Sequence, residues 1–413
     1  MSRSILRLPS QITPPRLVLA AFVALVLVVA VSTLLPEGDP HDGALAPVTE
    51  QEYAATSGVP GPGPLTSAAR EEIDRVLAES PDRVLARASS SAQAEGLVRC
   101  AEFEGQQYCL GRGWTDAEES AVQARTATAP VARSAPTETT GDLTDADFLA
   151  QRAAMDPTER EAAERAELEA AARSVAKVVL LRHQLLGEPL PDGFLERHPE
   201  ARTSATSDQS LARETAVSRT KTHSDYPRKS TVLRPRRTAE QTRTYWCGPA
   251  TMQMITWGWS GDRRPQRHWA ERLGTTTSGS AISDMVRVIN QDTGWDRRDR
   301  AGQYIVLDIS DWSYRKWLLL TMRHVADYRA PLVYHPVLRR QFYPYLDDDA
   351  SGHFQVGRGY NKRGRKPADV GYFEPWNQQR FDPSEPYIAR VQWRSAYRSY
   401  RANQAHPHQN IGV

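Results

Sequence analysis

The feature that most constrains this chain of 413 residues is the uneven distribution of its largest aromatic side chains. Nine of the ten tryptophans lie between Trp246 and Trp393, and Trp114 is the exception. Residues 120–240 are instead rich in Ala, Arg, Glu, Thr and Ser, which bury little apolar surface. Because one core usually stops growing at about 250 residues, we expect regions of different character, with the main core in residues 236–413.

The charge pattern argues against a nucleic-acid partner. The formal net charge is +2, and acidic and basic residues are mixed along most of the chain. Such a balance creates no strong field, and no arginine-rich stretch alternates with stacking aromatic residues. Nucleic acid is therefore not expected to bind.

The N-terminus carries a membrane signal. Arg3, Arg7 and Arg16 precede the apolar run 17–35, and acidic residues follow from Glu37 onward. This asymmetry predicts a cytoplasmic segment 1–16 and an extracytoplasmic remainder. The run approaches the ~20 residues that span hydrocarbon and no good cleavage site follows, so we favour an uncleaved transmembrane signal-anchor. A cleaved signal peptide, which would make the protein secreted, is the alternative, and a buried soluble helix is least favoured.

Two linkers are expected between this run and the main core. Residues 36–95 are rich in Pro and Gly at first, with a short helix expected over 66–87, and residues 117–235 form a low-complexity linker with disorder expected over 120–140. Within the second linker, an N-cap, a first-turn proline and a terminal glycine predict a long helix over 156–186. Its first half is polar nearly all round, so we interpret it as a spacer or a helix that binds a protein partner.

Residues 96–116 are predicted to form a β-hairpin that carries a disulfide. Cys100 and Cys109 are placed symmetrically about Glu104-Gly105, so a two-residue turn puts the two sulfurs on opposed strand positions. An extracytoplasmic compartment favours their oxidation. Two free thiols are the alternative.

The C-terminal region alternates helical and strand-like patterns. Helices are expected from Cys247, over 282–290 and over 312–328. Strands are expected over 331–337, 353–360 and 370–374. Helices followed by a sheet predict an α+β domain over 236–413.

Cys247 is the candidate nucleophile of this domain. It stands directly before Gly248-Pro249, which marks a helix start, so its sulfur is expected beside the free N–H groups of that helix. Such a site lowers a thiol pKa. The alternative is an inert buried cysteine, but pairing of the other two cysteines would leave Cys247 as the odd thiol in an oxidising compartment, which favours a functional role.

Three further positions supply what a thiolate nucleophile needs. His353 begins a strand after a Ser-Gly pair and is the candidate base, whereas His324 and His335 fit packing roles better. Glu374 is the candidate residue that orients the histidine, with Asn377 as the alternative. Gln241 is the candidate oxyanion donor beside the Cys247 backbone N–H.

These motifs resemble the C39-like cysteine peptidase family over about residues 236–400. The matching elements are Gln241-x5-Cys247-Gly248-Pro249-Ala250, then Gly352-His353-Phe354-x-Val356, and a strand that ends in an acid-Pro pair. The resemblance implies a papain-like fold, with Cys247 as nucleophile, His353 as base and Gln241 as oxyanion donor. One departure is Glu374-Pro375, where the family usually has Asp-Pro, so either the backbone compensates for the extra methylene or Asn377 takes the role.

No metal or cofactor is expected. The acidic loop Asp347–Asp349 lacks EF-hand spacing, so a solvated turn is favoured over a site for calcium or for a cationic residue of the substrate. Zinc-ligand spacing, a phosphate loop and a dinucleotide fingerprint are absent from the sequence.

The sequence therefore predicts an extracytoplasmic cysteine peptidase that acts on peptide or protein substrates through a Cys247 thioester. If an amine resolved the thioester, the same residues would catalyse transpeptidation. The competing hypothesis is a catalytically degenerate domain that binds or scaffolds cell-envelope peptides.

Overall fold

The structure is a computed structural model that describes residues 44–45, 64–129, 140–201, 221–293, 303–363, 369–376, 379, 381, 383, 386–395, 397–401 and 411–413. All of them belong to one compact unit, Ala44–Val413. The apolar run 17–35 lies outside the described residues. Within the described part of the chain, no helix combines the length and the apolar character that a bilayer crossing requires.

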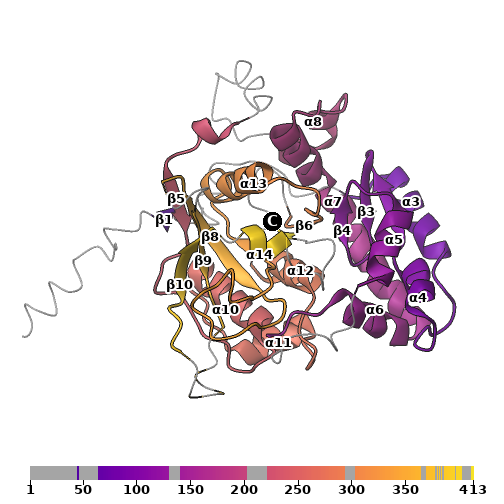
Figure 1. The fold of residues 1–413 in the computed structure, drawn as a ribbon. Helices are drawn as coiled ribbons and strands as arrows, with labels where there is room; N and C mark the ends of the chain where they lie inside the picture. Colours follow the sequence, from indigo (N-terminus) through magenta and orange to yellow (C-terminus); the bar gives the residue numbers. More distant parts are fainter. Residues whose placement is uncertain are drawn as a thin grey trace, which may run out of the picture. The chain divides into compact units, whose positions relative to one another are not determined.

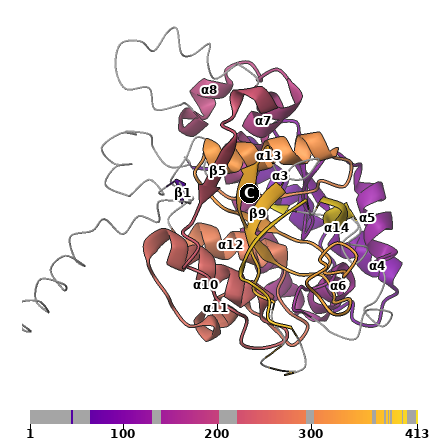
Figure 2. The ribbon, with the colours of Figure 1, turned by 60° about the vertical axis from the view of Figure 1, so that its left-hand side comes forward.

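The described strands join in one mixed sheet, as Figure 1 and Figure 2 show for its larger strands. Its order is β1-β5-β8-β7-β11-β6-β4-β3-β2, while β9 pairs with β8 and β10 with β9. The pairs among β5, β7, β8, β9 and β10 are antiparallel. The bounds are β1 Ala44–Leu45, β2 Cys100–Phe103, β3 Gln106–Cys109, β4 Gly113–Thr115, β5 Lys229–Val232, β6 Val306–Leu307, β7 Leu332–Tyr334, β8 Gln355–Asn361, β9 Asp369–Phe373, β10 Val391–Arg394 and β11 Ile411–Gly412.

Helices pack on this sheet, so the described unit has both helical and sheet layers, as the predicted α+β class requires. Both α10 and α13 contact β8, and α12 contacts β6 and β11. The helices are α3 Ser67–Ala78, α4 Ser90–Leu97, α5 Glu119–Ala127, α6 Asp145–Ala154, α7 Pro157–Leu186, α8 Phe194–Arg197, α10 Cys247–Ser260, α11 Gln266–Leu273, α12 Ile282–Asp292, α13 Tyr314–Ala326 and α14 Tyr397–Arg401, with 3-10 turns η2 Pro199–Ala201 and η3 His223–Asp225.

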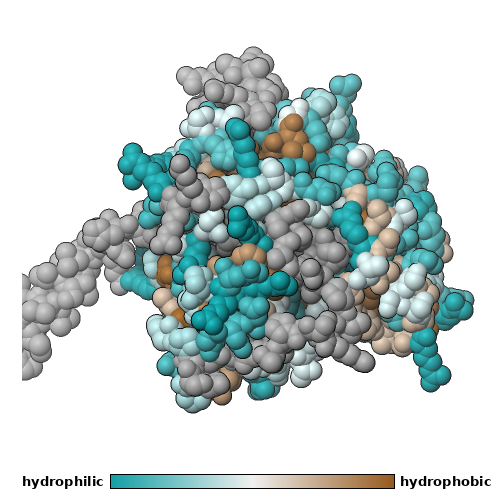
Figure 3. Space-filling view, in the orientation of Figure 1, coloured by the Kyte–Doolittle hydropathy of each residue, from teal (hydrophilic) through white to brown (hydrophobic). Residues whose placement is uncertain are grey.

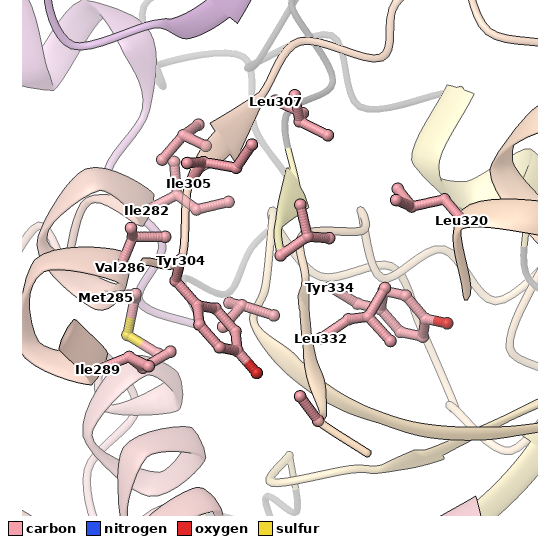
Figure 4. Close-up of a cluster of buried hydrophobic side chains, with 14 of the residues drawn as sticks. Ile282, Met285, Val286, Ile289, Tyr304, Ile305, Leu307, Leu320, Leu332 and Tyr334 are labelled. Carbon is pink, nitrogen blue, oxygen red and sulfur yellow. The ribbon is translucent and has the colours of Figure 1, made fainter. Parts of the chain in front are cut away.

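The core between helices and sheet is apolar and continuous. Figure 4 shows Ile282, Met285 and Ile289 of α12 beside Tyr304 and the strand that follows it. These three residues recur at helical spacing, which gives α12 one apolar face to bury. The molecular face in Figure 3 is mostly hydrophilic, with hydrophobic residues in small separate patches. Burial of the apolar residues in this core fixes the helices that carry the candidate site against the sheet.

The long helix α7 forms where its capping residues indicate. Asp156 caps it through Thr158 N (2.9 Å), and Gly187 ends it in the left-handed region at φ 77°. The expectation of an exposed spacer is wrong, because even the polar first half is partly buried. Arg160 donates to the carbonyl of Arg83 (3.1 Å), and Glu164 forms a buried ion pair with Arg99. That a protein partner binds this helix stays a prediction.

The hairpin β2–β3 contains the predicted disulfide between Cys100 and Cys109, which face each other in the register with a Cα–Cα distance of 4.0 Å. Glu104 and Gly105 both have positive φ, 48° and 74°, as a two-residue turn of the primed type requires. The hairpin is not a separate module, because β4 pairs in parallel with β6 through Trp114 and Leu307.

The two predicted linkers contain more ordered structure than expected. Residues 36–95 contain α3 and most of α4, and residues 117–235 contain α5, α6, α8 and β5 in addition to α7. The expectation of disorder over 120–140 is wrong for residues 120–129, where Val122 of α5 is buried beside Leu97 and Leu149. A few apolar residues suffice in these segments because they pack onto a shared core and need no core of their own.

Candidate active site

Cys247 is the first residue of α10, and its side chain is fully buried. The next residue, Gly248, leaves no room for a side chain, because a Cβ there would lie 2.7 Å from Ser280 Oγ. Pro249 stands in the first turn, where its missing N–H costs no helical hydrogen bond. The Cys-Gly-Pro run therefore starts the helix and fixes the thiol at its N-terminal end.

The expectation of a lowered thiol pKa is wrong for this state of the protein. Burial raises the pKa of Cys247 well above its ordinary value, and the Asp142 carboxylate raises it further. Backbone hydrogen bonds from Phe354 and Gly248 act in the opposite direction but do not compensate. Loss of solvent thus outweighs the helix N-terminus, and the thiol is neutral here.

His353 and Glu374 are brought together by two antiparallel strands. His353 lies just before β8 and Glu374 just after β9, so the start of one strand meets the end of the other. His353 Nε2 lies 2.7 Å from Glu374 Oε1, and both side chains are fully buried. The extra methylene of Glu374 relative to aspartate therefore does not prevent the contact with the histidine.

Glu374 accepts hydrogen bonds at both carboxylate oxygens. Oε1 accepts from His353 Nε2 and from the Trp376 N–H (2.8 Å), while Oε2 accepts from Gln355 Nε2 (2.6 Å) and the Tyr345 hydroxyl (3.0 Å). Burial acts to raise the pKa of Glu374, but the charge of His353 and these hydrogen bonds outweigh it and lower the pKa. The carboxylate is therefore ionised and holds His353 in one orientation.

The second ring nitrogen of His353, Nδ1, is available to act as a base. Nδ1 is buried and has no hydrogen-bond partner among the described residues. The ring also meets Trp376 edge to face, with centroids 6.2 Å apart. Because Nε2 is held by the Glu374 carboxylate, Nδ1 is the ring nitrogen that is left to exchange a proton with a neighbouring group.

Gln241 lies close to the start of α10 with its backbone N–H bonded to Pro375 O (2.9 Å). Its side-chain nitrogen donates to the carbonyls of Thr244 (2.7 Å), Arg243 (3.1 Å) and Thr140 (3.3 Å). The Cys247 backbone N–H also donates to Thr140 O, at 3.3 Å. The two predicted oxyanion donors therefore converge on one carbonyl oxygen.

Two other predicted features were the alternative third residue Asn377 and the acidic loop Asp347–Asp349. Asn377 lies outside the described residues. Asp347, Asp348 and Asp349 are exposed, and Asp349 accepts from the Arg340 backbone N–H (2.8 Å). In the part of the chain that the structure describes, no group of three or more His, Cys, Asp or Glu side chains is arranged to hold a metal.

Several residues of the site were missed by sequence reasoning. Gln355 and Tyr345 hold Glu374, and their pattern alone carries no signal of that role. His335, interpreted as a packing residue, is buried directly after β7, and its Nε2 lies 3.1 Å from Asp142 Oδ2. Asp142 and Thr140 contact site residues that lie 101 to 212 residues further along the chain, so no local pattern reveals these contacts.

The site combines a buried thiol at a helix start, a histidine–carboxylate pair at the ends of two antiparallel strands and two convergent N–H donors. This combination defines a cysteine peptidase-type domain. Residues 233–404 match the model of the Peptidase_C39 like family, so this C-terminal region is a C39-like domain. The match contains Gln241, Cys247, His353 and Glu374 and excludes Thr140. Comparison of the chain with curated proteins and with solved structures gave no match.

Proposed function

We propose that residues 233–404 form a papain-like cysteine peptidase domain that hydrolyses peptide bonds. The observation that carries the proposal is the convergence of the Cys247 N–H and Gln241 Nε2 on one carbonyl oxygen, beside a buried His353–Glu374 pair. A peptide carbonyl in that place receives two donors that strengthen as its oxygen becomes negative. The family match to residues 233–404 supports the same reaction class.

The proposed mechanism assigns one role to each side chain. His353 Nδ1 removes the Cys247 proton, and the thiolate attacks the substrate carbonyl carbon to form a tetrahedral oxyanion. Collapse breaks the C–N bond, His353 protonates the leaving amine, and a Cys247 thioester remains. His353 then activates the water that hydrolyses the thioester, while Glu374 stabilises the charged imidazole in each step.

We also propose that the domain works outside the cytoplasm, attached to the membrane through residues 17–35. The basic residues before this run and the acidic residues after it support that orientation. N-terminal sequencing of the mature protein tests the anchor: an intact start supports it, and a new terminus between residues 32 and 60 refutes it in favour of secretion.

The peptidase proposal is tested with the full-length chain purified in detergent and a fluorogenic peptide library under reducing conditions. Cys247→Ala and His353→Ala are each expected to abolish hydrolysis, and the double variant to cost little more, because the two residues act in one step. Gln241→Ala is expected to retain activity about 10²–10³-fold lower, since one oxyanion donor remains. Hydrolysis that survives in Cys247→Ala contradicts the proposal.

A peptide-binding domain without turnover is the second candidate function. The raised pKa of Cys247 and the occupied donors favour it, because a neutral thiol is a poor nucleophile. Binding of library peptides with equal affinity to the wild type and to Cys247→Ala, without cleavage by the wild type, would support this function and refute the first.

A further inference from the structure

A short segment of the chain, Thr140–Asp142, lies across the candidate active site. The Thr140 carbonyl oxygen accepts from both the Cys247 N–H and Gln241 Nε2, each at 3.3 Å. In the proposed reaction those donors face the carbonyl that is attacked. Thr140 is fully buried and Asp142 nearly so, at 2% exposure. The segment therefore stands where the carbonyl of a substrate would stand.

Both halves of the domain hold this segment, the sheet side through the side chains of Ser351 and Thr140 and the helical side through backbone hydrogen bonds. On the sheet side, Ser351 Oγ accepts from the Thr140 N–H (3.0 Å), and Thr140 Oγ1 donates to the Gly352 carbonyl, directly before His353. On the helical side, the Ser280 N–H donates to Gly141 O (2.9 Å), and the Leu143 N–H donates to Ser280 O (2.8 Å). Hydrogen bonding of a peptide backbone to the backbone beside it, as between this segment and Ser280, is one way that a peptide-binding cleft holds a peptide.

The residues after Thr140 fit their surroundings closely. A Cβ on Gly141 would lie 2.2 Å from the backbone carbon and oxygen of Tyr245, and its φ of 106° also favours glycine. The Asp142 carboxylate contacts His335 Nε2 at 3.1 Å and fills the space beside Gly352, where a Cβ would lie 1.8 Å from Asp142 Oδ2. The cleft thus accommodates only glycine at the position of Gly141, and at the next position it accommodates an acidic side chain beside His335.

We propose that Thr140–Asp142 occupies the substrate cleft as a segment of the protein's own chain, and that this cleft selects peptides in which glycine and then an acidic residue follow the scissile carbonyl. The proposal rests on the proposed function for the identity of that carbonyl. External peptides then compete with the segment, and its departure exposes both Cys247 and the oxyanion donors.

Occupancy is tested by the rate at which iodoacetamide alkylates Cys247 in the full-length chain, measured by peptide mass mapping. Gly141→Ala should expel the segment and raise the rate at least tenfold, which corresponds to about 1.4 kcal/mol on the closed–open equilibrium. The matched control is Gly187→Ala, at a glycine of φ 77° with no atom within 4 Å of its added Cβ, and its rate should equal that of the wild type.

A second, milder variant keeps the test decisive if Gly141→Ala does not fold. Ser351→Ala removes the acceptor of the Thr140 N–H without adding atoms, and it should raise the alkylation rate in the same direction by a smaller factor. Circular dichroism confirms the fold of each variant. Equal alkylation rates in the wild type and in either folded variant would overturn the proposal.

Selectivity is tested by protection of Cys247 in the Gly141→Ala chain with a synthetic peptide of residues 137–145. This peptide should slow alkylation. The same peptide with Gly141→Ala should give no protection, and with Asp142→Asn it should protect more weakly. Equal protection by all three peptides would refute selection of glycine and acid.

The alkylation and protection measurements do not depend on peptide hydrolysis, so the occupancy proposal and the peptidase proposal can be refuted separately. If Gly141→Ala exposes Cys247 and the peptide protects it, yet this variant hydrolyses no library peptide, the peptidase proposal is refuted and the occupancy proposal stands. If hydrolysis depends on Cys247 but Gly141→Ala changes neither alkylation nor hydrolysis, the occupancy proposal is refuted and the peptidase proposal stands.

Discussion

Replacement of Glu374 by glutamine tests the centre of the site, because it changes one oxygen to a donor and alters the shape very little. Oε1 of Glu374 accepts from His353 and from the Trp376 N–H, and these two bonds survive if the glutamine oxygen takes that place. Oε2 accepts from Gln355 Nε2 and the Tyr345 hydroxyl, and an amide nitrogen there cannot accept.

The expected loss of stability in Glu374→Gln follows from these four hydrogen bonds. The Tyr345 hydroxyl can turn and accept from the new amide, but Gln355 Nε2 then faces a second donor in a fully buried place. One unpaired buried donor costs about 1–3 kcal/mol. At roughly 2–4 °C per kcal/mol, we expect Glu374→Gln to lower the melting temperature by about 2–12 °C at pH 7.

Thermal unfolding followed by circular dichroism measures this effect, with Glu71→Gln on the exposed side of α3 as the control that makes the same change at the surface. The pKa of Glu374 is lowered in the folded protein, so its stabilisation is complete above the ordinary value of 4.5 and is lost as the pH falls through the lower folded value. The difference from wild type should therefore shrink below pH 4.5. A difference no larger than that of Glu71→Gln at pH 7, or one that grows on acidification, would refute the reasoning.

Two further predictions concern the N-terminal part of the described unit. Reduction of Cys100–Cys109, which closes a loop with a sequence separation of 9, should lower the free energy of unfolding by about 2–3 kcal/mol in urea titrations, and an unchanged midpoint would contradict this. Arg99→Met leaves Glu164 buried without its ion-pair partner and should cost about 3–5 kcal/mol in the same assay, whereas Arg165→Met, at an exposed pair with Asp74, should cost under about 1 kcal/mol. Equal costs for the two arginines would show that burial does not set the effect.

The elements that could be predicted from the sequence are those whose signals are local. The start of α10 at Cys247 follows from the adjacent Gly248-Pro249, and the opposed cysteines follow from a turn that needs positive φ at Glu104 and Gly105. Each signal lies within a few residues and acts through backbone geometry, so no knowledge of the tertiary structure is needed.

The remaining features depend on contacts that no local pattern encodes. The first half of α7 looked solvated because Arg160 and Glu164 are charged, but both are buried through partners far away in sequence. Likewise, Thr140–Asp142 stands in a Thr-, Ala- and Pro-rich stretch without apolar periodicity. It is ordered by backbone hydrogen bonds and by the absence of a side chain at Gly141, and these are visible only once the fold brings Tyr245 beside it.

The position of Asp142 connects the blocked donors to the unreactive thiol. Burial and the Asp142 carboxylate are the two largest causes that raise the pKa of Cys247, and Asp142 belongs to the segment that is proposed to occupy the cleft. If Thr140–Asp142 leaves as proposed, the carboxylate moves away and the sulfur gains access to water, while the N–H groups of Gly248 and Phe354 stay and favour the thiolate. A single displacement would therefore free the oxyanion donors and lower the thiol pKa together, so that occupancy of the cleft and nucleophilicity of Cys247 exclude each other.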